Sequence, residues 1–124
     1  FPASIRAALD HLALGLRVGV GQMLAVGLIE ALRQPGLGEV FVDASLEPIL
    51  GAMADRLRQH QTRGEMRAAD PRIAAIQLVA PLLLADLHQQ QLGGAATHPL
   101  PMDHLLDQIT QAFVRAYATA APGD

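Results

Sequence analysis

The sequence has no cysteine, no lysine and few aromatic residues, and each shortage excludes a class of chemistry. Without cysteine there is no disulfide, no thiolate nucleophile and no thiolate zinc site, which is compatible with a reducing cytoplasm. Charged residues make up only 17% of the chain and the formal net charge is −3, so the basic surface typical of nucleic-acid binding is missing. We therefore expect a cytoplasmic protein that needs no cofactor.

The segment that looks most apolar in the sequence is too short for a membrane span. The run from Ile73 to Leu87 is shorter than the roughly 20 residues of a membrane span, and it contains Gln77 and Asp86. The first residues do not combine a basic start with an apolar stretch, as a signal peptide would. We expect no membrane partner.

Apolar residues, mostly Ala and Leu, make up 51% of the 124 residues, and their spacing is helical throughout. The sequence predicts a single all-α domain over residues 1–124, folded as an antiparallel helical bundle of five long helices and one short one. The long helices are expected at residues 3–16, 19–33, 45–63, 71–92 and 101–120, and the short one at residues 37–44.

Helix boundaries are signalled by capping residues. Ser45 and Asp70 suit helix N-caps, Pro71 suits a first helical position, and Gly64 suits a helix end. The helix over residues 19–33 is apolar nearly all round, which predicts a place in the middle of the bundle.

The helix over residues 71–92 has two sides on a helical wheel. Arg72, Asp86, Gln89 and Gln90 gather on the side expected to face water, and Ile73, Ile76, Ala80, Leu84 and Leu87 lie opposite. The apolar arc is too broad for one neighbour, so we expect one flank to pack in the domain and the other against a second subunit. Pro81 is expected to kink this helix.

The order of these turn signals resembles the C-terminal domain of the TetR family of bacterial transcriptional regulators. The matching residues are Arg63-Gly64-Glu65, Asp70-Pro71, Ala74-Ala75, then Glu30, Pro35 and Phe41 upstream and Phe113 and Tyr117 near the end. The resemblance covers residues 19–117. The chain departs from the family pattern at Ala25, where an Arg is often seen, and the N-terminal helix-turn-helix domain of the family is absent from it.

The resemblance implies the ligand-sensing and dimerisation domain of a transcriptional regulator, usually a repressor. Residues 1–17 would be the helix that connects it to the missing DNA-binding domain, through which alone operator DNA would be bound. The last two long helices would form a four-helix bundle in a homodimer. A small apolar effector would shift the connecting helix and release the DNA.

Candidate residues for ligand binding and for dimerisation can be chosen from their helical positions and side-chain chemistry. An apolar pocket with a few polar groups is typical of ligand sites. The candidate ligand-binding residues are Gln22, Met23, Gly27, Glu30, Phe41, Met53, Leu57, Gln77, Pro81 and Leu84. The candidate dimer-interface residues are Leu83, Leu87, Leu105, Ile109, Ala112, Phe113 and Ala116.

Catalytic and metal-binding motifs are not found. No pair of histidines has the spacing of a metal site, and the two serines, Ser4 and Ser45, lie in no nucleophile motif. We expect neither an enzyme nor a metal protein. Two other readings stay open: a helical protein–protein interaction module, and a carrier of small apolar ligands without a regulatory role.

Overall fold

The computed structural model describes residues 1–120, and this part of the chain is helical. The helices are α1 (Pro2–Gly15), α2 (Gly21–Arg33), α3 (Leu37–Phe41), α4 (Glu47–Thr62), α5 (Pro71–Asp86) and α6 (Met102–Tyr117). Wide, π-type turns at Leu16–Val20, Val42–Leu46 and Leu87–Gln91 extend α1 into α2, α3 into α4, and the end of α5. The predicted all-α class is confirmed.

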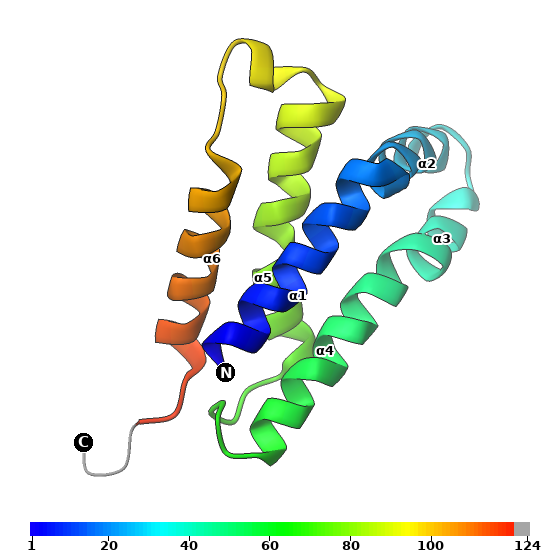
Figure 1. The fold of residues 1–124 in the computed structure, drawn as a ribbon. Helices are drawn as coiled ribbons and strands as arrows, with labels where there is room; N and C mark the ends of the chain where they lie inside the picture. Colours follow the sequence, from blue (N-terminus) through cyan, green and yellow to red (C-terminus); the bar gives the residue numbers. More distant parts are fainter. Residues whose placement is uncertain (121–124) are drawn as a thin grey trace.

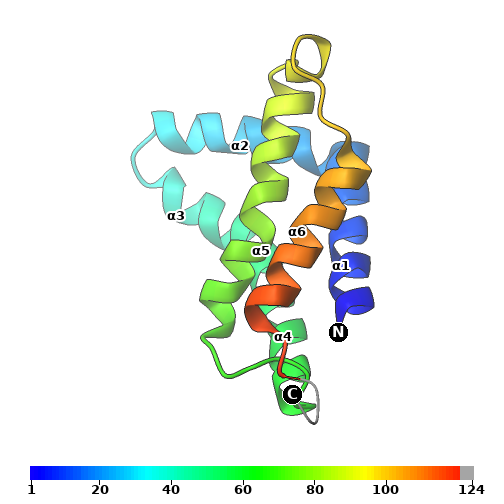
Figure 2. The same cartoon turned by 90° about the vertical axis from the view of Figure 1, so that its left-hand side faces the viewer.

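The predicted count of five long helices and one short one is wrong. Within residues 1–120 the structure has four continuous helical segments, 2–33, 37–62, 71–91 and 102–117, with a short 3-10 turn at Gly94–Ala96. The first segment does bend sharply at Gly19, whose φ of 132° is a conformation that glycine adopts far more readily than other residues. Glycine there changes the helix direction without ending the helix (Figure 2).

Capping chemistry explains one predicted helix start and corrects another. The carboxylate of Asp70 accepts a hydrogen bond from the Arg72 backbone N–H at 2.9 Å, so the predicted N-cap of α5 is confirmed. Ser45 is not an N-cap, because it lies inside a continuous helix and α4 begins at Glu47. Gly64 follows the end of α4 with a φ of 76°, as expected for a helix stop.

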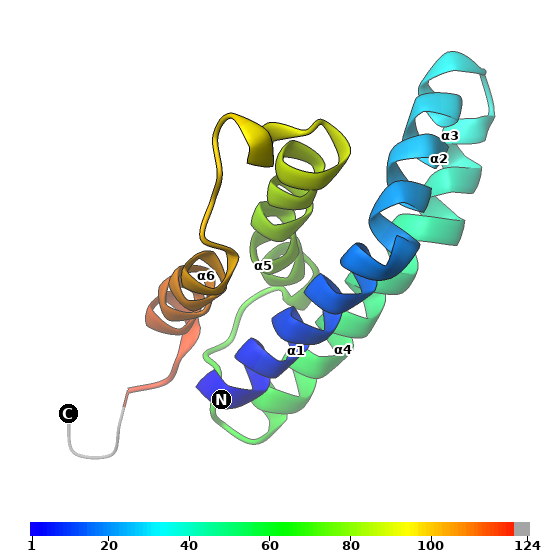
Figure 3. The same cartoon turned by 45° about the horizontal axis from the view of Figure 1, so that its top comes forward.

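Helix α5 packs against α1, α4 and α6, and α6 also packs against α1. Helices α1 and α4 run side by side (Figures 1 and 3) and are joined by hydrogen bonds of Ser4 with Arg56 and His60. Helices α2 and α3 pair with each other, and α2 packs against the turn Leu87–Gln91 at the end of α5 before the pair extends beyond it (Figure 2). The core therefore lies among α1, α4, α5 and α6, and its fully buried large side chains are Ile5, Leu9, Leu57, Leu78, Val79 and Leu82.

The prediction that the second helix lies in the middle of the bundle is wrong. In α2 only Gly21 is buried, while Met23 is 72% and Leu32 79% exposed. The bend at Gly19 directs α2 away from the core, so its apolar composition does not give it neighbours on every side.

One helix, Pro2–Arg33, is long and apolar enough to cross a membrane by length and composition, with a window of mean hydropathy 1.8 that is 11% buried. One such helix near the N-terminus is weak evidence for a membrane span, because signal sequences and core helices of soluble proteins can have the same length and hydropathy. Its bend divides it into α1 of 14 residues and α2 of 13 residues, each shorter than the roughly 20 residues of a straight span.

Candidate functional site

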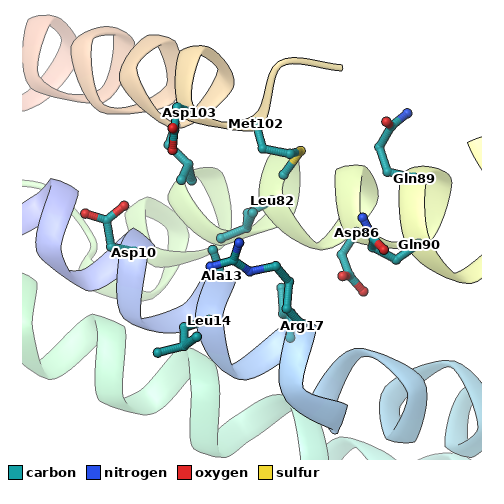
Figure 4. A pocket seen from close by; sticks show the side chains of 12 residues that line it. Asp10, Ala13, Leu14, Arg17, Leu82, Asp86, Gln89, Gln90, Met102 and Asp103 are labelled. Atoms are coloured by element: carbon teal, nitrogen blue, oxygen red, sulfur yellow. The ribbon is translucent and has the colours of Figure 1, made fainter. Parts of the chain in front are cut away.

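A cavity of about 340 Å³ lies where the end of α1, the end of α5 and the start of α6 meet (Figure 4). Its apolar wall comes from α1, α5 and α6, and polar side chains surround it. The lining residues are Asp10, Ala13, Leu14, Leu16, Arg17, Leu82, Asp86, Gln89, Gln90, Met102, Asp103 and Leu106. A mostly apolar wall with a few polar groups is the usual composition of a small-molecule site.

Two of the three carboxylates of this cavity already have a cationic partner. The Arg6 guanidinium donates to Asp10 at 2.9 Å and lies 3.7 Å from Asp103. It also pairs with Asp107. The hydrogen bond to Asp10, with the nearby carboxylates, raises the pKa of Arg6. These ion pairs connect α1 to the start of α6, and Arg6 balances the negative charges of Asp10 and Asp103.

The third carboxylate, Asp86, is buried at the junction of α5 with the bend after α1. It is 7% exposed and accepts one hydrogen bond, from the Gln91 amide at 3.3 Å. A Cβ on Gly21 would lie 2.4 Å from its Oδ2, so glycine is needed there. Figure 4 shows Asp86 and Arg17 both projecting into the space between α1 and α5.

A second, more apolar cavity of about 210 Å³ adjoins the first. Leu16 and Asp86 line both of them. The other lining residues are Gly21, Leu24, Ala25, Leu28, Phe41, Leu46, Leu83, Leu84, Leu87 and Gln91. The two cavities therefore form a pair of chambers with a carboxylate at their boundary.

The predicted ligand residues are spread over several places. Phe41 and Leu84 line the second chamber, and Met53 lines a separate hollow of about 400 Å³ between α1 and α4. Gln22, Met23 and Gly27 line a shallow depression on α2. Leu57 is fully buried core, and Glu30 and Pro81 are exposed. Gln77 is exposed and accepts a hydrogen bond from the Tyr117 hydroxyl on α6. The structure does not bring the ten predicted ligand-binding residues together into one site.

The helical wheel of α5 assigned its water-facing side only in part correctly. Arg72 and Gln90 are exposed as predicted, but Asp86 and Gln89 are buried. On the side predicted to be buried, Ile73 is 55% and Leu84 67% exposed. Gln89 is fixed by two hydrogen bonds to the loop before α6: its amide donates to the His98 carbonyl at 2.8 Å, and its oxygen accepts from the Leu100 N–H at 2.9 Å. The position of Asp86 inside the apolar run Ile73–Leu87 was the sequence feature that could have indicated a site there.

The predicted dimer residues divide between a free surface and the cavity. Leu105, Ile109, Ala112 and Ala116 recur at helical spacing along α6. Leu83 and Leu87 on α5 are half-buried and line the second chamber. Ala112 and Ala116 are exposed, and Ile73, Ile76 and Leu84 add exposed apolar area on α5. Phe113 instead lies in the domain's own core, with its ring centroid 4.7 Å from that of Tyr117.

A second polar cluster joins α1 to the end of α4. His60 is 3% exposed, and its ring nitrogens lie 2.8 Å from the Ser4 hydroxyl and 3.0 Å from the Glu65 carboxylate. Arg56 also donates to Ser4 Oγ at 3.0 Å. The hydrogen bond from His60 lowers the pKa of Glu65. Sequence analysis missed this cluster, because its members are 56 and 5 positions apart in the chain.

The comparison with protein families decides the class of the chain. The family model for the AefR-like transcriptional repressor, C-terminal domain, matches residues 5–119. The chain belongs to the TetR family. Comparison with the curated proteins and with the solved structures gives no significant match. TetR-family C-terminal domains are regulatory rather than enzymatic, and they typically dimerise and bind ligands.

The polar groups of this TetR-family domain form no metal site in the described part. Among residues 1–120 there is no group of three or more His, Asp or Glu side chains placed to hold an ion. The site has the features of a binding pocket: apolar walls, amides held by the loop before α6, and charged groups at the boundary of two chambers.

Proposed function

We propose that this chain is the effector-binding and dimerisation domain of a TetR-like cytoplasmic transcriptional repressor, released from operator DNA by a small apolar effector. The family match over residues 5–119 carries the proposal. The two-chambered cavity supports it, since the larger chamber of about 340 Å³ falls in the range of about 300–1,000 Å³ typical of ligand sites.

The position of the cavity suggests how binding would be transmitted. Its walls come from α1, which would lead from the DNA-binding domain, and from α5 and α6, which would form the dimer interface. A ligand that fits only one arrangement of these helices favours that arrangement by its differential affinity. A shift of α1 in both subunits changes the spacing of the two DNA-binding domains, which must match the half-sites.

The ligand-binding part of the proposal is tested by filling the larger chamber. Ala13 lines this chamber and lies on α1, so Ala13→Phe should occupy part of its volume. Ala7 lies on the same helix, is exposed and lines neither chamber, so Ala7→Phe is the matched control.

Small apolar compounds should raise the melting temperature of the wild-type chain by mass action, and differential scanning fluorimetry measures the shift. Ala13→Phe should reduce the shift, and Ala7→Phe should keep it. If no compound in a broad set stabilises the wild-type chain, or if both variants respond alike, this chamber is not the effector site.

A protein-docking role without an effector is the second candidate, and the exposed surface of α2 and α3 favours it. Leu32 is 79% and Val40 59% exposed, as are other apolar side chains of these helices. Exposed apolar patches often mark interaction sites. Under this alternative the chain binds a protein partner, and neither chamber responds to small molecules.

A further inference from the structure

The Asp86 carboxylate lines both chambers and has no cationic partner in the described part of the chain. Among residues 1–120, no arginine or histidine nitrogen lies within 4.0 Å of it, and the Gln91 amide at 3.3 Å is its sole hydrogen-bond donor. No buried side-chain oxygen of these residues lacks a hydrogen-bond partner, so the second oxygen of Asp86 is reached from the cavity. A carboxylate oxygen that faces a mostly apolar cavity is placed to pair with a cationic group of a ligand.

The start of α2 passes close to this carboxylate. A Cβ at Gly21 would lie 2.4 Å from Asp86 Oδ2 and 2.8 Å from the backbone oxygen of Leu16, so glycine allows this approach. Immediately after Asp86 the helix widens into the π-type turn Leu87–Gln91. Such turns occur often at functional sites, and this one places Gln91 beside the carboxylate.

The surroundings of Asp86 specify the rest of a ligand. On one side lies the larger chamber, and on the other lies the smaller chamber, whose wall is formed mainly by leucines and by the ring of Phe41. We propose that the effector is a lipophilic organic cation, whose positive group pairs with Asp86 and whose apolar part fills the chamber of Phe41. This inference rests on the proposed function and names its ligand class.

The other charges near the cavity do not supply the missing cation. Arg6 is committed to Asp10, Asp103 and Asp107. Arg17 lines the larger chamber, but it is exposed and therefore solvated, and no described carboxylate lies within 4.0 Å of its guanidinium. The rival account is that Arg17 turns to neutralise Asp86, and it predicts a different result for an Arg17 variant.

Calorimetry with three probes of equal chain length separates charge from apolar contact. The probes are octyltrimethylammonium, octanol and octyl sulfate, each below its micelle-forming concentration. The wild-type chain should bind the cation at least about tenfold more tightly than the alcohol or the sulfate, because only the cation can form an ion pair with Asp86.

Asp86→Asn should remove this preference while the alcohol still binds, since the amide keeps the shape of the carboxylate. Asp55→Asn is the matched control, because Asp55 is exposed on α4 and pairs with Arg58 outside both chambers. Arg17→Gln should keep or strengthen cation binding. Weaker cation binding in Arg17→Gln would overturn the proposal.

Stability provides a readout that a purely structural role would change. Asp86→Asn keeps the shape of the side chain, so the melting temperature of the ligand-free chain should stay close to that of the wild type, while stabilisation by octyltrimethylammonium is lost. A fall in the melting temperature would make Asp86 a structural residue and overturn the inference.

The inference and the proposed function fail in different ways. If octanol binds as tightly as the cation, or if Asp86→Asn keeps the preference, the cation class is wrong and ligand sensing survives. If octyltrimethylammonium does not bind at all, the cation class is again wrong, and the compound set used with Ala13→Phe still tests ligand sensing separately.

Discussion

His60 shows what a single buried polar residue does in this domain. It connects Ser4 at the start of α1 with Glu65 after the end of α4, at 2.8 and 3.0 Å. Its ring also packs at 5.0 Å from that of Phe1, so one side chain fixes α1 against the end of α4. The larger chamber lies at the opposite end of α1, which leaves that end free to respond to a ligand.

The Glu65 pair predicts a pH dependence of stability. The hydrogen bond from His60 lowers the pKa of Glu65 below its ordinary value of 4.5, so the ionised carboxylate stabilises the folded chain. This contribution is present above the unfolded-state pKa and is lost as the pH falls through the lower, folded-state pKa.

Glu65→Gln should therefore lower the melting temperature at pH 7, and the difference from wild type should shrink as the pH falls below about 4.5. Glu39→Gln, at an exposed carboxylate on α3, is the control and should leave the melting curve unchanged. A difference for Glu65→Gln that stays constant down to low pH would contradict the role of the carboxylate charge.

At the scale of the elements, the start of α5 depends on one hydrogen bond from a side chain. Asp70→Ala removes the acceptor for the Arg72 N–H and should lower the free energy of unfolding by about 1 kcal/mol in urea denaturation. Ser45→Ala should change it far less, because Ser45 caps no helix in the structure. Equal losses in the two variants would show that the sequence-based assignment of Ser45 as a cap was right.

The boundaries of the elements were largely predictable, because they depend on local chemistry. Asp70 satisfies a free N–H at the start of its own helix, and Gly64 adopts a positive φ directly after α4. The joined helices were not predictable in the same way. Gly19 and Ser45 resemble a break and a cap, but the chain continues as helix through wide turns at both places.

Burial of each helix face was harder to predict than helix position, because it depends on neighbours distant in sequence. Asp86 and Gln89 lie toward the cavity, since α1 and the loop before α6 approach that side of α5. Ile73 and Leu84 remain exposed, since no helix within residues 1–120 packs closely over them. A helical wheel orders the residues of one helix but does not say which side the rest of the fold approaches.

At the scale of the whole molecule, the exposed apolar residues Ile73, Ile76 and Leu84 on α5, together with exposed Ala112 and Ala116 on α6, predict a homodimer. Ala112 is small and exposed, so Ala112→Glu would bury an unpaired charge in the proposed interface. The dimer dissociation constant should rise by roughly 100-fold or more, since such a charge costs several kcal/mol. Sedimentation equilibrium measures it.

Gln111→Glu provides the matched control for the dimer. Gln111 is the neighbouring residue and is exposed, and it lies one turn after Asp107, which pairs with Arg6 on α1, so the same charge should leave the dimer intact. Phe113→Glu is unsuitable, because Phe113 is buried in the domain's own core and its replacement would unfold the chain. A wild-type chain that sediments as a monomer would remove the basis for the proposed interface.

The central claim is that ligand occupancy of the cavity between α1, α5 and α6 controls DNA binding. Fluorescence anisotropy of the full-length regulator on labelled DNA from the region preceding its own gene tests this most directly. We predict that compounds which stabilise the chain also release the DNA, and that Ala13→Phe abolishes both effects while Ala7→Phe keeps them. Compounds that stabilise the chain yet leave the DNA affinity unchanged would contradict the claim.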